Sequence, residues 1–237
     1  MIARVATLIG MILMPLGAAA SGEGGDRYYP PEGCVGVVTT QNRDCIVNNI
    51  YTCEADQPGS SWRLMFDRDG PVFLSKIDFE TQWLESYDLF PTRRDALRQP
   101  ADDPASLTEL LDTGVDTYDF IVAGTQGVTR VVGFDRLTGD DVMIDGELLL
   151  GTEFSARHES TTGGDLHVQG REFVSVKHRR FFPGVTTLTQ GDDTEEHDRT
   201  PIEFIYPGES GFFSTTPLYE CEASLARFVP TTKGSDQ

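Results

Sequence analysis

Residues 118–158 read YDFIVAGTQGVTRVVGFDRLTGDDVMIDGELLLGTEFSARH, and their pattern is the strongest structural signal in the chain. The ranges 118–123, 128–137 and 147–158 are rich in apolar residues that recur with a period of two over most of their length, and a short apolar run occupies 142–144. Turns that contain glycine separate these runs. A period of two residues with such interruptions is typical of antiparallel β-strands joined by tight connections.

The same pattern extends in both directions along the chain. Further candidate strands lie at 35–40, 45–51, 62–67, 72–78 and 82–87, and then at 166–169, 172–182, 185–189, 202–206 and 212–221. Asp69-Gly70 stands between two apolar runs and predicts a β-hairpin. We therefore expect a mostly-β fold, an antiparallel meander that forms a barrel, a half-barrel or a sandwich.

One short helix is predicted near residues 104–112. Asp103 is a candidate N-cap, Pro104 suits the first turn, and Gly114 is a candidate stop signal. Three leucines recur at helical spacing, namely Leu107, Leu110 and Leu111.

The N-terminus predicts export. Arg4 precedes an apolar run at 5–16, and Ala18-Ala19-Ala20 provides small residues for cleavage, which together predict a signal peptide at 1–20. No apolar run of membrane-spanning length follows, so we expect no stable membrane insertion. The predicted destination is the periplasm in a Gram-negative cell, or the outside of other cells. We expect a flexible leader at 21–32, a single β-rich domain at 33–230 and a disordered tail at 231–237.

The chain is strongly acidic, with 38 acidic and 19 basic residues and a net charge of −19. Removal of Arg4 with the signal peptide leaves a net charge of 18 − 38 = −20. This charge repels phosphate backbones and anionic lipid surfaces, which argues against a nucleic-acid-binding protein. It favours solubility and cationic partners.

Four cysteines in the exported part predict two disulfides, and these are Cys34, Cys45, Cys53 and Cys221. If 45–53 is one strand, its two end cysteines lie about 26 Å apart and each must bond elsewhere. A tight turn near Asn48-Asn49 would instead allow a Cys45–Cys53 bridge. Paired Cys or Cys/His zinc spacings are absent, so we predict no metal and no cofactor.

A short sequence echo favours one pairing. Residues 51–55 read YTCEA and residues 219–223 read YECEA, which would fit two segments that lie side by side, although chance similarity over five residues would fit as well. The predicted bridges are therefore Cys53–Cys221 and Cys34–Cys45.

Candidate catalytic groups are few. His158 and His178 are predicted to face the inner side of the sheet near strand ends, as a pair for proton transfer or metal binding, although unrelated rim positions would also fit the pattern. The acidic stretch 191–198 lacks the spacing of a calcium loop. Sequence motifs for nucleophilic, phosphate-binding and zinc chemistry are absent, and we assign no catalytic residue.

Aromatic residues are spread over most of the candidate strands, so an apolar cavity or groove is the predicted binding feature. Candidate ligand-binding residues are Trp62, Trp83, Phe154, Phe181 and Phe213. The sequence thus favours an exported, non-catalytic β protein that binds an apolar small molecule or a partner protein of the cell envelope. The alternatives are a hydrolase with a histidine-containing site and an assembly factor without a small ligand.

Overall fold

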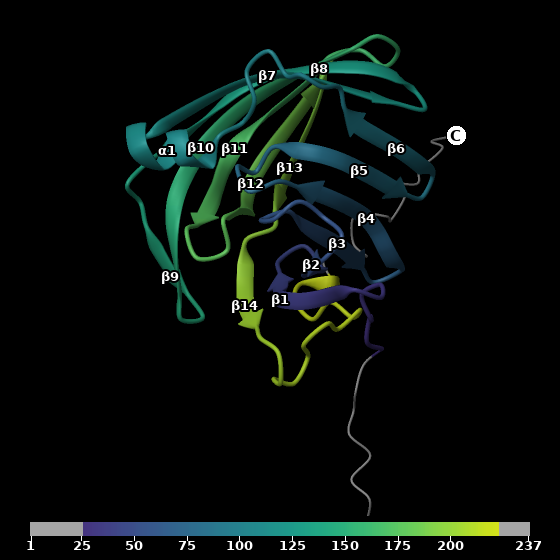
Figure 1. Cartoon of the computed structure of the whole chain (residues 1–237), viewed down its shortest axis with the longest axis vertical. Coiled ribbons are helices and arrows are strands. Elements are labelled where there is room, and N and C mark those ends of the chain that lie inside the picture. The colour runs from purple at the N-terminus through teal and green to yellow at the C-terminus, as the bar shows by residue number, and fades with distance from the viewer. Residues whose placement is uncertain (1–25, 223–237) are drawn as a thin grey trace, which may run out of the picture.

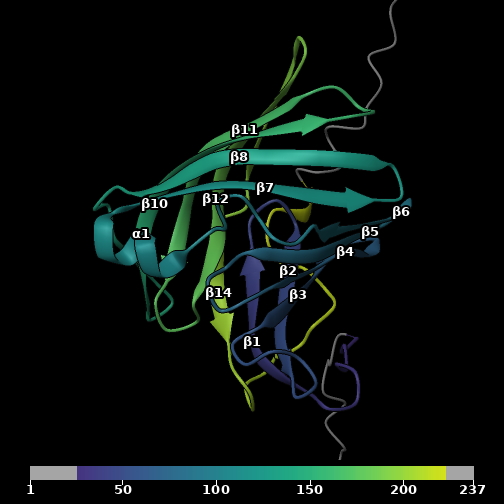
Figure 2. The same cartoon turned by 45° about the horizontal axis from the view of Figure 1, so that its top comes forward.

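The strands of the protein form one antiparallel sheet of 14 strands (Figures 1 and 2). The computed structural model describes residues 26–222, so the predicted signal peptide at 1–20 and the predicted tail at 231–237 lie outside the described residues. The expected mostly-β meander with one short helix is confirmed.

The elements follow one another in the order in which they pair. The strands and the helix are β1 (Cys34–Asn42), β2 (Ile46–Cys53), β3 (Ser61–Asp67), β4 (Gly70–Ile77), β5 (Trp83–Leu89), β6 (Thr92–Leu97), α1 (Leu107–Thr113), β7 (Val115–Gly124), β8 (Gly127–Leu137), β9 (Val142–Ile144), β10 (Glu147–Ser160), β11 (Leu166–Ser175), β12 (Arg180–Gln190), β13 (Asp193–Asp198) and β14 (Pro201–Ile205). Neighbours in sequence pair from β1 to β8 and from β10 to β13, β8 pairs with β10, and β9 pairs with the start of β10. β14 returns to pair with β1.

This last pairing curls the sheet back on itself. β13 and β14 stand at opposite ends of the strand order, yet only two residues connect them. The backbone N–H of Arg199 donates to the carbonyl of Gly184 (3.0 Å), and the N–H of Arg43 donates to the carbonyl of Thr200 (3.1 Å). The two ends therefore lie close together, although no ladder joins β14 to β12 or β13.

The helix α1 covers one end of the curled sheet, beside the starts of β7 and β10 (Figure 2). Ser106 caps it by accepting a hydrogen bond from the N–H of Glu109 (3.2 Å), and Gly114 ends it in the left-handed conformation. The stop at Gly114 was predicted correctly, but Asp103 is not the cap because it forms a β-bridge with Asp119. Among residues 26–222, no helix has the length and hydropathy to cross a membrane.

The strand boundaries predicted at Gly170 and Gly184 are wrong, and the turn at 176–179, which contains no glycine, was not predicted. The predicted strand 172–182 is a hairpin, in which β11 ends at Ser175 and β12 begins at Arg180. Gly170 and Gly184 lie inside these strands, beside a β-bulge. A Cβ at Gly170 would lie 2.1 Å from the carbonyl oxygen of Val185, so close backbone approach requires glycine there.

The disulfides are Cys34–Cys53 and Cys45–Cys221, so the predicted pairing is wrong. The register of the β1–β2 hairpin places Cys34 directly opposite Cys53. Cys45 lies at the other end of β2, as expected from the strand argument, and there it meets the chain near its C-terminus. The echo between 51–55 and 219–223 does not reflect adjacency.

The predicted strand 212–221 is a segment of turns that side-chain amides hold against β1 and β2. Asn49 Nδ2 donates to the carbonyl of Ser214 (2.9 Å). Gln41 donates to the carbonyl of Thr216 (3.1 Å) and accepts from the N–H of Leu218 (3.0 Å). Buried amides thus replace a sheet ladder in satisfying this backbone.

We predict that the two disulfides stabilise the fold unequally. The Cys45–Cys221 bridge closes a loop of 176 residues and the Cys34–Cys53 bridge a loop of 19. In the loop-entropy model, removal of the first by paired Cys→Ser changes costs about 5 kcal/mol, and removal of the second about 3 kcal/mol. Urea unfolding of both double variants measures this difference, and a larger loss from the shorter loop would contradict it.

Candidate functional site

The five aromatic residues predicted to bind a ligand are scattered through the structure. Phe213 is only 1% exposed and lies in a core cluster with Val47 and Phe66. Phe181 packs beside the leucines of α1. Neither residue lies where a ligand could reach it without displacing core packing.

The remaining three aromatic residues are more accessible. Trp62 stacks on Tyr51, with ring centroids 6.3 Å apart, and its indole N–H donates to Asp56 (2.8 Å). Trp83 is partly exposed at the start of β5. Phe154 on β10 lines a recess, described below.

His158 and His178 do not form a pair. Leu150 on β10 faces Val174 on β11, whereas His158 lies eight residues farther along β10. Eight residues of extended strand span about 26 Å. Burial, and then the charge of Arg93, lower the pKa of His158. His178 lies beyond Ser175 in the β11–β12 hairpin, at the other end of these strands.

His178 belongs instead to a polar cluster with Glu147, Lys177 and Tyr206. The hydroxyl of Tyr206 lies 3.1 Å from His178 Nε2 and donates to Glu147, and Lys177 Nζ donates to the same carboxylate (2.5 Å). Burial opposes ionisation, but the hydrogen bonds from Lys177 and Tyr206 lower the pKa of Glu147. These contacts tie the β11–β12 hairpin to β10 and to the end of β14.

A second group of charged side chains lies inside the curled sheet. Asp116 on β7 and Asp135 on β8 face each other in register, and they are 2% and 7% exposed. Burial raises the pKa of Asp116 to about 6. Burial, together with the charge of Asp116, raises the pKa of Asp135 to about 7. Burial and then Asp135 raise the pKa of Glu172 on β11 well above its usual value. We call Asp116, Asp135 and Glu172 the acidic trio.

Two arginines approach the same interior from other strands. Arg63 lies on β3 and Arg180 on β12, which are far apart in the strand order, yet the charge of Arg63 acts on Arg180. Ile50 on β2 lies opposite Arg63. Ile50 also packs in one cluster with Phe182, which follows Arg180 by two residues on β12. Burial lowers the pKa of Arg63 to about 10 and of Arg180 to about 9, and the charge of Arg63 contributes to the second shift.

Arg63 Cζ lies 5.7 Å from the ring centroid of Phe73, but neither arginine has an anionic or hydrogen-bonding partner in the described part of the chain. Within residues 26–222, neither guanidinium makes a side-chain hydrogen bond or has a carboxylate oxygen within 4.0 Å. Arg63 Nε and Arg180 Nη1 are buried. Ser75, which faces Arg63 on β4, is 1% exposed and its hydroxyl is also without a partner in the described part of the chain.

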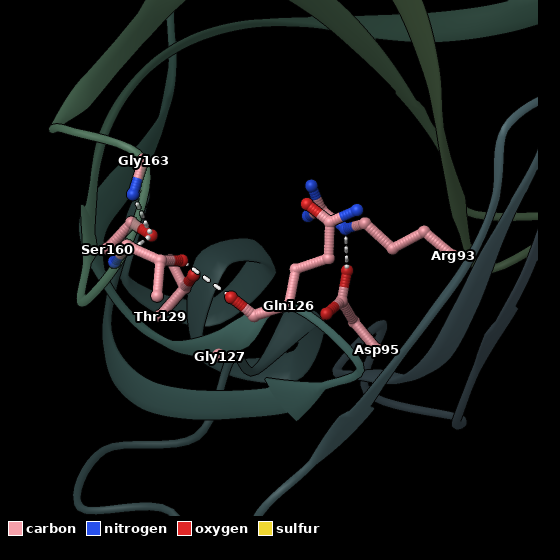
Figure 3. Close-up of a pocket in the computed structure, with 8 residues that line it drawn as sticks. Arg93, Asp95, Gln126, Gly127, Thr129, Ser160 and Gly163 are labelled. Atoms are coloured by element: carbon pink, nitrogen blue, oxygen red, sulfur yellow. Dashed lines mark hydrogen bonds and ion pairs between the residues drawn. The ribbon is translucent and has the colours of Figure 1, made fainter.

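A small polar recess marks the end of the strands opposite α1, and we call it the end recess (Figure 3). Its volume is about 80 Å³, and its lining includes Arg93, Asp95, Gln126, Thr129, Ser160 and Gly163. Arg93 Nε donates to Asp95 (2.8 Å), and the side chain of Gln126 points toward Arg93. Helix α1 lies just before the first residue of β7, and Asp95 pairs with Gly124, the last residue of β7. The length of β7 therefore separates α1 from the end recess by about 30 Å.

A larger outer recess of about 340 Å³ lies over β8, β10 and β11. Its lining includes Phe134, Glu153, Phe154, Ser155, Gln169 and Arg171. Ser155 Oγ lies 2.9 Å from His167 Nε2, a contact that depends on the β10–β11 register. Phe154 lies opposite Asp135 and shares its face of the sheet. Ser155 projects from the other face, so the Ser155–His167 contact lies on the outer side of the sheet.

Sequence reasoning missed the acidic trio and both arginines, although one signal for the trio was visible. Asp116 precedes Tyr118 and Phe120 at alternate positions of a strand, so a charge shares the buried face. No such pattern identifies Arg63 or Arg180, because their approach depends on the curl of the sheet. Among residues 26–222, no group of three or more His, Cys, Asp or Glu could hold a metal ion.

We predict that Asp135→Asn makes the fold more stable above neutral pH. A carboxyl whose pKa is higher in the folded than in the unfolded chain reduces stability as pH rises from about 4 to about 7. The variant cannot ionise, so its free energy of unfolding should exceed that of the wild type by about 2–4 kcal/mol at pH 8 and match it at pH 4. Chemical unfolding at both pH values measures this, with the exposed Asp192→Asn as control. Parallel pH profiles for wild type and Asp135→Asn would contradict it.

Comparisons with known proteins do not assign a function to these residues. The chain matches no protein-family model, no curated protein and no solved structure. The functional assignment therefore rests on the chemistry of the acidic trio and the two arginines.

Proposed function

We propose that the protein is an exported binding protein that holds a small ligand inside its curled sheet. The observation that carries this proposal is the pair of buried arginines, Arg63 and Arg180, without a hydrogen-bonding or anionic partner in the part of the chain that the structure describes. The buried carboxyls of the acidic trio lie nearby, and of these Asp116 accepts a hydrogen bond from the N–H of Ser106 (2.9 Å). Buried charges of this kind are costly unless another group pairs with them. Because these buried charges reduce stability, we attribute their presence to a function.

Several other features support this proposal. Two disulfides suit an oxidising compartment outside the cytoplasm. Tyr118, Phe120 and Val131 form an apolar cluster beside the acidic trio, so a ligand would find both apolar and charged contacts. The sequence suggested a wholly apolar ligand, and the interior charges favour one that also carries a polar or charged group.

We predict that protein purified from its exporting host retains a ligand. Its mass under native conditions should exceed the mass of the mature chain, and the excess should disappear under denaturing conditions. Ala156 lies in the apolar cluster and Arg157 is exposed on the other face of β10, so they form a matched pair. Ala156→Leu should reduce the retained ligand and Arg157→Leu should not. Equal retention by both variants would contradict an interior site.

A specific contact favours a second candidate function, the hydrolysis of an ester at the outer recess. Ser155 Oγ lies within hydrogen-bond distance of His167 Nε2, as a serine nucleophile and its base require. Ser155 Oγ would attack the carbonyl carbon while His167 takes the hydroxyl proton and passes it to the departing alcohol. Water would then hydrolyse the acyl-serine, with His167 again as the base.

We predict from this second candidate that p-nitrophenyl acetate hydrolysis depends on Ser155. Ser155→Ala should abolish the activity by removing the nucleophile, and Ser160→Ala, which lies in the end recess, should retain it. Release of p-nitrophenolate measures both rates. If wild type and Ser155→Ala hydrolyse the ester equally, the Ser155–His167 contact is structural.

A further inference from the structure

We infer that Arg63, Ser75 and Arg180 form a binding site for an oxyanion, the carboxylate or phosphate group of the ligand. This inference rests on the proposed binding function and names the chemistry of its interior site. The three residues come from β3, β4 and β12. Each has a buried polar atom that lacks a hydrogen-bond partner among residues 26–222.

The register and the packing bring these groups to one region. Arg63 lies between Ile50 on β2 and Ser75 on β4, and facing residues of antiparallel strands project to the same side. Ile50 packs in the cluster that contains Phe182, which follows Arg180 at the same-face spacing of two residues. Both arginines therefore border the same apolar cluster.

The charge balance at this place is positive. Arg63 and Arg180 repel each other, and the charge of Arg199 also acts on Arg63. Glu172 attracts Arg63 across the interior but does not approach within 4.0 Å of it. The raised pKa of Glu172 favours its protonated form, which reduces its value as a counterion. An anion between the arginines would supply the missing charge.

The donors also match the geometry of an oxyanion. A guanidinium presents several N–H groups in a planar fork that suits carboxylate and phosphate oxygens. The Ser75 hydroxyl adds one more donor from the neighbouring strand. Arg63 and Glu172 are only half-buried, so this part of the interior retains accessible surface.

A neighbour of Arg63 favours an anion attached to an apolar chain. Phe73, two residues before Ser75 on β4, is half-buried, and Arg63 Cζ lies 5.7 Å from the centroid of its ring. Inorganic phosphate would satisfy the N–H donors but gain nothing from such a neighbour. A carboxylate with an alkyl chain would gain from both.

The test uses octanoate, inorganic phosphate and 1-octanol as probes of the mature protein, with disulfides intact and any retained ligand removed. Calorimetry should show binding of octanoate, weaker binding of phosphate and no binding of 1-octanol. Arg63→Met and Arg180→Met should each weaken octanoate binding by about tenfold or more, because each removes a charge-assisted hydrogen bond. Ser75→Ala should weaken it less, and the exposed Arg157→Met is the matched control that should bind as the wild type does.

Thermal unfolding without any probe separates a binding role from a structural one. If the arginines serve to bind a ligand, Arg180→Met should raise the melting temperature of the ligand-free protein, because an apolar side chain replaces an unpaired buried charge. A structural arginine would give the opposite shift.

Three outcomes would overturn the inference. If 1-octanol binds the wild type as tightly as octanoate, the interior binds ligands without recognising an anion, and only the proposed function survives. If octanoate and phosphate bind the arginine variants as tightly as they bind the wild type, the oxyanion site does not exist. If no probe binds and the exported protein also carries no retained ligand, the proposed function fails with it.

Discussion

The free energy of burying charge is the constraint on which the other features of this structure depend. The curl of the sheet brings β3 and β12 near each other, and β3, β8, β11 and β12 each carry a buried ionisable side chain. Replacing buried charges by apolar residues of similar size is often neutral or stabilising. A chain shaped for stability alone would therefore place leucine or methionine at Arg180. The same strands do use leucine and valine where α1 packs, so the fold has no general need for charge in its interior.

Because the interior is costly, other contacts must hold the sheet in its curled form. The Cys45–Cys221 bridge and the amides of Gln41 and Asn49 hold the segment at 212–221 against β1 and β2. On the opposite edge, the cluster around Tyr206 joins the end of β14 to the β11–β12 hairpin. These two groups of contacts act on β1, on β12 and on the end of β14, close to the point where the sheet fails to close between β13 and β14. They keep Arg180 across from Arg63 without a continuous ladder of hydrogen bonds.

The sequence predicted most of the strands because residue alternation is a local property, but it missed β6 and β13 and wrongly predicted a strand at 212–221. It predicted the Asp69-Gly70 hairpin and the stop of the helix at Gly114 for the same reason, since both depend on glycine at one position. The prediction of strand boundaries failed at glycines, because glycine occurs both in turns and inside strands. Gly170 and Gly184 look like turn residues, yet they permit close backbone approach inside long strands. The predicted disulfide pairing was wrong and the two arginines were missed for a different reason. Both depend on contacts between segments that are distant in the chain.

The surface charge and the interior charge have opposite consequences for an anionic ligand. The acidic exterior, including the exposed carboxylates of the edge strand β13, discourages edge-to-edge pairing and repels small anions in solution. This repulsion grows with the charge of the ligand, so a dianion such as phosphate is opposed more strongly than a monocarboxylate. Apolar contacts with the half-buried Phe73 do not depend on that field. Repulsion outside and N–H donors inside therefore select together for an anion of low charge on an apolar body.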